Sequence, residues 1–177
     1  MTRLLVVSDS SSLILGVKAG LLDLICKEFI VEIPRKVFEE SVVSGKASGK
    51  VDAFIIENAV EDGAIIVKDV RKSVGKIGKW LKEFNLGSGE ADSILLYIQS
   101  NAKLLLTDDK QAINAAKIVG VAWTTLPDLI LEFASRKKID CESALDALKI
   151  VQEEGRYKIN FILEAFRKIE EMKGGKK

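Results

Sequence analysis

Residues 4–9 read Leu-Leu-Val-Val-Ser-Asp, and residues 104–109 read Leu-Leu-Leu-Thr-Asp-Asp. Each stretch starts with an apolar run that is too short for a helix and ends in acidic side chains. A continuous apolar run of this length is typical of a parallel strand that is buried on both faces of a sheet. In open α/β sheets, functional groups gather beyond the carboxyl ends of the strands. We therefore expect acids at that edge of a sheet.

The remainder of the chain alternates between further strands and helices. Three more strands are predicted at residues 29–33, 64–67 and 121–124. Helices are predicted at 13–27 with a break near Gly20, from Pro34 onward, and at 51–60, 71–84, 90–100, 111–119, 126–137, 141–153 and 159–172, with a loop at 45–49. This order predicts an α/β fold: a three-layer sandwich with a central, mainly parallel five-stranded sheet plus C-terminal helices. We expect residues 1–137 to form the sheet domain and 138–173 a helical extension packed on it or on a partner.

The composition of the chain limits the class of protein and the kinds of catalytic site that it can have. The chain has 177 residues, of which 47% are hydrophobic and 30% charged, enough for a folded core. No apolar run approaches the roughly 18 residues of a membrane span, and no signal peptide is recognised, so we expect a cytoplasmic protein without a membrane partner. Cys26 and Cys141 are predicted to be buried free thiols. The sequence contains no histidine, which excludes Ser-His-Asp triads and His-ligated zinc within this chain.

The acids at the predicted strand ends are candidates for a site. Asp9 follows the first strand, and Asp108 and Asp109 follow the fourth. A single acid in such a place is more often a helix cap. Two strands that end this way, in a chain without histidine, favour a functional cluster, because neighbouring carboxylates repel one another unless a cation neutralises them.

Helical periodicity selects further candidates. At ~100° per residue, Glu40 lies about 110° from the apolar centre of its predicted helix, nearer the core than Glu39 at about 150°. In the helix after Gly89, Glu90 and Asp92 lie on opposite sides of the apolar face, roughly 160° apart, so they can hardly bind one ion. Glu90 is favoured because it lies in the first turn, where the helix dipole stabilises an anion. Asp92 is a secondary candidate.

Clustered carboxylates without histidine or cysteine form a hard-oxygen site. Mg²⁺ or Mn²⁺ suits such a site, with much of the coordination sphere left to water and substrate phosphate. The matching chemistry is hydrolysis of a phosphodiester, in which the ion activates a bound water and stabilises the developing charge.

The motifs VVSDSS, IPRKVFEE, GSGEADSI and LLLTDD occur in this order and carry Asp9, Glu40, Glu90 and the pair Asp108 and Asp109. In this the chain resembles the PIN-domain family, and more narrowly a prokaryotic branch with GEA and Asp-Asp motifs that is related to VapC-type toxins. The resemblance extends over about residues 4–172. It implies a five-stranded parallel sheet, a magnesium- or manganese-dependent ribonuclease, frequent homodimers and, for many members, the toxin role in a toxin–antitoxin pair.

Position by position, the resemblance assigns roles to individual residues. Asp9, Glu40 and Glu90 match the first three acids of the family, and either Asp108 or Asp109 matches the fourth. Ser10 and Thr107 match small hydroxyl residues that flank the acids and orient them or a water. Two features depart from the better-known toxins: glutamate replaces the more usual aspartate in the GEA motif, and a helical extension follows Lys137.

A basic segment lies between the second and third acidic motifs. Residues 68–82 hold six basic residues against one acid, Asp69, and Lys72, Lys76 and Lys79 fall opposite the apolar stripe of the predicted helix. They form either a contact surface for RNA phosphates or an ordinary solvated face. The following Gly87-Ser88-Gly89 is interpreted as a flexible helix junction. Trp80 and Trp123 are expected in core or interface packing.

The C-terminal helices have apolar stripes at residues 144, 145, 148 and 151 and at 162, 163, 166 and 169. These stripes either complete the fold or form a homodimer face or an antitoxin groove. The sequence as a whole predicts an endoribonuclease with a metal held by Asp9, Glu90 and the Asp108/Asp109 pair, and with Glu40 shaping the site. The alternatives are a structure-specific DNA nuclease and a non-catalytic nucleic-acid-binding or regulatory module.

Overall fold

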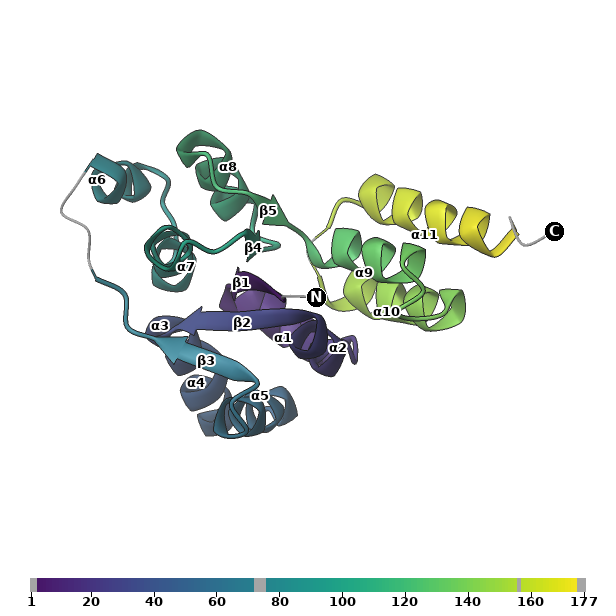
Figure 1. Cartoon of the computed structure of the whole chain (residues 1–177), viewed down its shortest axis with the longest axis horizontal. Helices are drawn as coiled ribbons and strands as arrows, with labels where there is room; N and C mark the ends of the chain where they lie inside the picture. Colours follow the sequence, from purple (N-terminus) through teal and green to yellow (C-terminus); the bar gives the residue numbers. More distant parts are fainter. Residues whose placement is uncertain (1–2, 72–75, 156, 175–177) are drawn as a thin grey trace.

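The structure, a computed structural model, describes residues 3–71, 76–155 and 157–174, and they form one sheet with helices around it (Figure 1). The strands are β1 (Leu4–Ser8), β2 (Phe29–Pro34), β3 (Ile65–Lys68), β4 (Leu104–Leu106) and β5 (Trp123–Thr124). Their order is β3-β2-β1-β4-β5, and each neighbouring pair is parallel. The predicted α/β fold is confirmed, and β1 and β4 have their predicted bounds.

The helices largely follow the expected order. They are α1 (Ser10–Lys18), α2 (Leu22–Glu28), α3 (Arg35–Phe38), the π-helical turn η1 (Glu39–Val43), α4 (Ser44–Ala47), α5 (Val51–Glu61), α6 (Lys76–Glu83), α7 (Ser88–Ser100), α8 (Lys110–Val119), α9 (Leu126–Ser135), α10 (Cys141–Glu154) and α11 (Ile159–Gly174). Gly20 breaks the first predicted helix with a φ of +68°, a conformation that glycine adopts without strain.

Two local predictions are wrong. Pro34 does not open a helix: it is the last residue of β2, with an extended ψ of 151°, because β2 continues its pairing with β3 as far as Pro34 and Lys68. Part of the predicted loop at 45–49 is helical, because α4 continues directly from η1 through residue 47. The predicted helix at 71–84 is seen as α6, whereas residues 72–75 lie outside the described residues.

The sheet is covered on both faces, which explains the continuous apolar strands. Successive side chains of a strand point to opposite faces, and in β1 Val6 and Val7 are both buried. Val7 belongs to a core with Leu105, Ile94 of α7 and Ala115 of α8. Val6 belongs to the larger core on the other face, which includes buried residues of α1, α2, α5, α9, α10 and α11. The two helical layers hold β1 and β4 at the centre of the molecule.

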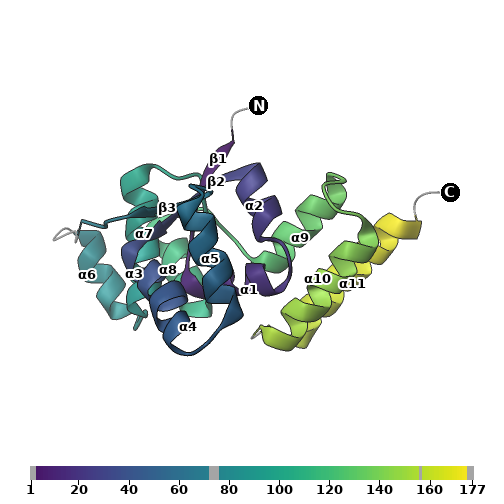
Figure 2. The same ribbon diagram turned by 90° about the horizontal axis from the view of Figure 1, so that it is seen from below.

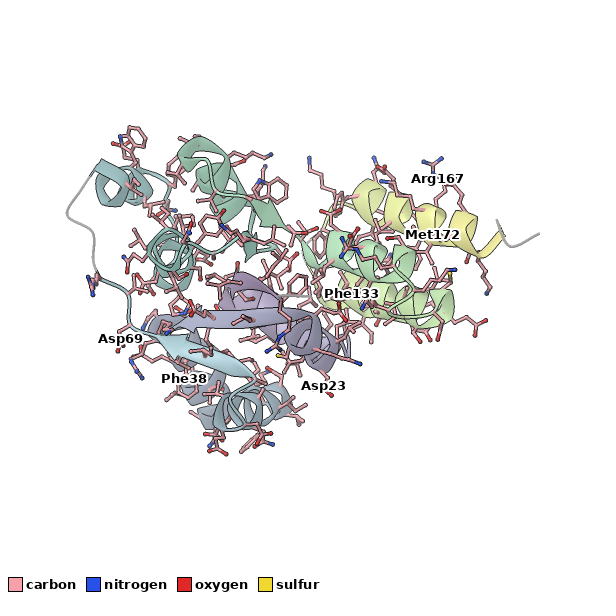
Figure 3. All side chains as sticks on the ribbon, in the orientation of Figure 1. Asp23, Phe38, Asp69, Phe133, Arg167 and Met172 are labelled. Carbon is pink, nitrogen blue, oxygen red and sulfur yellow. The ribbon has the colours of Figure 1, made fainter. Side chains whose placement is uncertain are left out.

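The C-terminal helices bury their apolar stripes within this chain. Helices α10 and α11 run side by side and pack on α9 (Figures 1 and 2). Leu148, Val151, Ile162 and Ile169 are buried in the larger core. Figure 3 shows Arg167 pointing away from the body of the molecule on the outer side of α11. Most residues of the two apolar stripes therefore pack in the core of this chain.

Two further expectations concern thiols and membranes. Cys26 is buried and free as predicted, and Cys141 is free but only half-buried. Within residues 3–71, 76–155 and 157–174, no helix combines the length and the apolar character needed to cross a membrane.

Candidate active site

Asp9 lies at the junction of β1 and α1 and is buried. Its Oδ1 accepts hydrogen bonds from Ser12 N at 2.8 Å and from Ser11 Oγ at 3.1 Å, so the carboxylate caps the N-terminus of α1. Its Oδ2 accepts a hydrogen bond from the hydroxyl of Thr107. The side chain is thus both a helix cap and a fixed acid at the carboxyl edge of the sheet.

The second pair of acids follows β4, the neighbour of β1 in the sheet. Asp109 caps α8, and its Oδ1 accepts from Ala112 N at 2.8 Å. Asp108 is held differently: its Oδ1 accepts from Leu126 N, the first residue of α9, at 2.8 Å, and also from the Tyr157 hydroxyl. Its Oδ2 is buried without a hydrogen-bond partner. Parallel pairing of β1 and β4 places Asp9 and Asp108 at one edge, and their charges interact.

Glu90 enters the site from the first turn of α7. Ser93 fixes this turn: its Oγ lies 2.8 Å from Gly89 O and 3.4 Å from Ser8 O at the end of β1. The Oε2 atom of Glu90 is buried and has no hydrogen-bond partner. A Cβ added at Gly87 would lie 2.1 Å from that atom. The glycine that was interpreted as a flexible junction therefore leaves space for the Glu90 carboxylate.

Glu40 lies in the π-helical turn η1, where Ser44 N donates to Glu39 O, five residues earlier. Its carboxylate accepts from Ser10 Oγ at 2.8 Å and from Ser88 Oγ at 3.1 Å, and so joins α1 to the start of α7. A Cβ added at Gly89 would lie 2.4 Å from Glu40 Oε2. Glu39 is exposed, as the helical periodicity predicted. It forms an ion pair with Lys36 at 3.1 Å.

Burial and mutual repulsion make these acids hard to ionise. The pKa of Asp9 is raised to about 6, mainly by burial and to a smaller extent by the nearby Asp108 carboxylate, against the hydrogen bonds from Thr107 and Ser12. The pKa of Asp108 is raised mainly by burial. Burial also raises the pKa of Glu90, with smaller contributions from the charges of Asp109 and Glu40. These charge interactions join the acids in two groups, Asp9 with Asp108 and Glu90 with Asp109 and Glu40. The five acids are called the acidic cluster below.

A cleft of about 480 Å³ opens beside the cluster. It is lined by Glu90, Asp108 and Asp109 together with Ser11, Ile14, Leu15, Lys18, Lys110, Glu154, Gly155 and Tyr157. Lys18 and Lys110 are exposed, and Lys18 pairs with Glu154. Sequence reasoning missed these two lysines and Tyr157. The placement of Lys110 directly after the Asp-Asp pair was an available signal, whereas nothing local in the sequence connects Tyr157 to residue 108.

Some of the predicted functional residues lie away from the cleft, and others lie outside the residues that the structure describes. Asp92 is half-buried on α7 and is not among the described residues that line the cleft. Lys72 and the side chains of Lys76 and Lys79 lie outside the described residues, so the basic surface stays a prediction. Trp80 is 46% exposed and lies outside the core of this chain, while Trp123 is half-buried and packs on the core formed with α7 and α8.

The acids fit a hard divalent cation by their chemistry. Two buried carboxylate oxygens, Glu90 Oε2 and Asp108 Oδ2, have no hydrogen bond of ordinary geometry. The Ser12 hydroxyl still lowers the pKa of Asp108, and the backbone N–H groups of Gly87 and Glu90 lower that of Glu90. A buried acceptor that is not fully satisfied is costly unless an ion or water binds it. In residues 3–71, 76–155 and 157–174, no three acid or thiol side chains are already gathered closely enough to hold an ion.

The fold and this acidic edge define an α/β protein with a carboxylate site at the ends of adjacent parallel strands. The family model described as a PIN domain matches residues 5–171, nearly the whole chain. The chain belongs to the PIN-domain family, whose members are typically nucleases and commonly use divalent metals. A comparison with curated proteins finds no match.

Proposed function

We propose that this protein is a divalent-metal-dependent endoribonuclease that hydrolyses RNA phosphodiester bonds. The observation that carries the proposal is the pair of buried oxygens without an ordinary hydrogen bond, Glu90 Oε2 and Asp108 Oδ2, on two acids that line one cleft together with Asp109. The negative charge of these acids repels a phosphodiester unless a cation lies between the acids and the phosphate. Membership of the PIN-domain family supports the same chemistry.

Asp9, Glu90 and the Asp108/Asp109 pair would hold the metal, Mg²⁺ or Mn²⁺. When bound, the ion supplies an activated water and stabilises negative charge on the phosphate. The protein's own residues position the acids: Thr107 fixes Asp9, while Ser10 and Ser88 fix Glu40. These hydrogen bonds hold the carboxylates in place before substrate arrives, which lowers the cost of organising the site.

Two lysines of the cleft support a polyanionic substrate. Lys18 and Lys110 line the same cleft as Glu90, Asp108 and Asp109. Cations beside an acidic centre attract the phosphates that flank the scissile bond. The basic face of Lys72, Lys76 and Lys79 would extend this contact, and charge reversal of these three lysines should weaken RNA binding.

The testing experiment is cleavage of matched RNA and DNA substrates by the purified protein with Mg²⁺, Mn²⁺ or chelator. We expect RNA cutting that needs the metal and is lost in Asp9→Asn, because this variant keeps the cap on α1 but removes a metal-binding charge. Preferential cutting of DNA would support a structure-specific DNA nuclease instead. Binding of RNA without cutting under any metal condition would support a non-catalytic or regulatory module.

We also propose that the protein forms a homodimer and acts as the toxin of a toxin–antitoxin pair, as many members of the PIN-domain family do. Val51, Phe54 and Ile55 on α5 are exposed apolar residues that suit self-association. Light scattering of the wild type and Phe54→Lys tests the dimer, with a monomeric variant expected. Growth arrest on expression of the wild type but not of Asp9→Asn tests the toxin role.

A further inference from the structure

The C-terminal extension contributes a side chain to the acidic site. Tyr157 follows α10 and precedes α11, 49 positions after Asp108, and its hydroxyl donates a hydrogen bond to Asp108 Oδ1. Tyr157 is half-buried and lines the cleft with Glu90, Asp108 and Asp109. The extension is therefore in direct contact with the acids.

The hydrogen bonds of Asp108 are divided unequally between its two oxygens. Oδ1 accepts from both Leu126 N and the Tyr157 hydroxyl, whereas Oδ2 is buried without a hydrogen bond of ordinary geometry. The buried Ser12 hydroxyl, also without such a bond, interacts with this carboxylate and lowers its pKa. Two donors on one oxygen fix the rotation of the carboxylate about its χ angles. With Oδ1 held in this way, Oδ2 is the oxygen left for a cation. Groups that hold the outer oxygen of a metal-binding carboxylate commonly tune the affinity for the metal.

Two neighbours hold the ring of Tyr157 in place. It stacks on Phe161 of α11, with ring centroids 6.0 Å apart and an interplanar angle of 18°. Gly155 also lies close to the ring, since an added Cβ there would come within 2.6 Å of the Tyr157 ring and 2.5 Å of Val151 O. Position 155 therefore has space for glycine alone while the tyrosine keeps this place.

The segment that carries Tyr157 is anchored to the sheet domain. Lys18 of α1 pairs with Glu154 at the end of α10, and α10 packs on α9, whose first residue gives the second donor to Asp108. Asp108 Oδ1 therefore accepts from the sheet domain and from the extension at once.

We propose that Tyr157 is a positioning residue for the metal site: its hydroxyl holds Asp108 so that Oδ2 faces a divalent cation, and the C-terminal extension is a working part of that site. This inference rests on the proposed function for the identity of the cation. It extends that function by assigning a role to a residue outside the acidic motifs.

The experiment measures Mn²⁺ affinity by calorimetry for the wild type, Tyr157→Phe and the control Tyr97→Phe. Tyr157→Phe keeps the ring and loses the hydroxyl. In the control, the lost hydroxyl accepts from Ala122 N at 3.3 Å, at the amino-terminal edge of β5 and away from the acids. We expect Tyr157→Phe to bind Mn²⁺ about 10- to 100-fold more weakly while circular dichroism shows a folded protein, and Tyr97→Phe to bind as the wild type does.

A second variant tests the position of the ring rather than the hydroxyl. Gly155→Ala keeps Tyr157 but displaces its ring, so it should weaken Mn²⁺ binding while circular dichroism shows a folded protein. Equal Mn²⁺ affinities of the wild type and Tyr157→Phe would overturn the inference, as would a wild type that binds no Mn²⁺. If the wild type binds Mn²⁺ in a Tyr157-dependent way but cuts no nucleic acid, the inference stands and the proposed nuclease activity fails.

Discussion

The hydroxyl of Thr107 donates a hydrogen bond to Oδ2 of Asp9, and these two buried residues are 98 positions apart in the chain. The contact crosses from β4 to β1 at the edge where both strands end. It links the first acid of the cluster to the strand that carries Asp108 and Asp109.

Replacing Thr107 by valine should destabilise the protein by about 1–3 kcal/mol at pH 8, because it leaves a buried, ionised carboxylate oxygen without its donor. Urea unfolding in chelator measures the change. Thr124→Val is the control. Thr124 lies in β5, the strand next to β4, and its hydroxyl makes only a 3.4 Å contact with the carbonyl oxygen of the following residue, Thr125. Equal losses of unfolding free energy in the two variants would contradict the importance of the Thr107–Asp9 contact.

The raised pKa of Asp9 predicts a definite pH dependence of stability. Because the folded-state pKa is about 6, above the ordinary 3.8, the folded protein binds the proton more tightly than the unfolded chain does. Stability without metal should therefore fall as the pH rises from about 4 through 6. The full cost of ionising Asp9 is on the order of 3 kcal/mol.

Asp9→Asn isolates this effect, since asparagine is an equally good helix cap. In chelator the variant should be more stable than the wild type at pH 8, and the difference should vanish below about pH 4. Urea titrations at pH 4, 6 and 8 measure it. A difference that does not change with pH would assign the effect to packing instead of charge.

A bound divalent cation should neutralise the repulsion between the carboxylates of the cluster and so stabilise the protein. At an Mn²⁺ concentration of 100 times the Kd, the free energy of unfolding should rise by about 2.7 kcal/mol, and Asp108→Asn should lose most of this gain. Asp140→Asn is a matched control, because Asp140 accepts a hydrogen bond from a backbone N–H, that of Ser143 in the first turn of α10, as Asp108 does from Leu126 N, but lies away from the cluster. Stabilisation of Asp108→Asn equal to that of the wild type would argue that the metal binds elsewhere.

Gly89→Ala separates activity from stability. Alanine is the better helix former, so the fold should persist, but its Cβ would lie 2.4 Å from Glu40 Oε2 and must displace that carboxylate. We expect nuclease activity to fall at least tenfold, while the melting temperature changes by only a few degrees. Unchanged cleavage would mean that the position of Glu40 does not matter for the reaction.

Lys110→Ala tests the phosphate contact. If Lys110 of the cleft pairs with one phosphate, the slope of log affinity for single-stranded RNA against log salt should become shallower by about 0.7. Lys149→Ala is the control, since Lys149 is exposed on α10 and pairs with Asp146 at 2.7 Å. Fluorescence anisotropy in chelator measures binding without cleavage, and the same slope in both variants would exclude the contact.

The sequence predicted the centre of the sheet well because β1 is short, apolar and buried on both faces, as Val6 and Val7 show. It was less successful where the backbone leaves regular geometry. The angle calculated for Glu40 assumed a regular α-helix, whereas residues 39–43 form a π-helical turn. Pro34 was predicted to start a helix because proline suits a first helical turn, and this can be read from the local sequence. Its pairing with Lys68 in the sheet depends on a distant segment of the chain.

By itself, then, the sequence determined the α/β class, the strand positions and the acids at the ends of β1 and β4, because hydrophobic periodicity and strand-end polarity are local properties. Only the tertiary structure decided which oxygens stay unpartnered, that Gly87 and Gly89 make space for Glu90 and Glu40, and that Tyr157 contacts Asp108. These depend on distances between segments far apart in the chain. Such distances follow from packing of the whole core, and no local pattern encodes them.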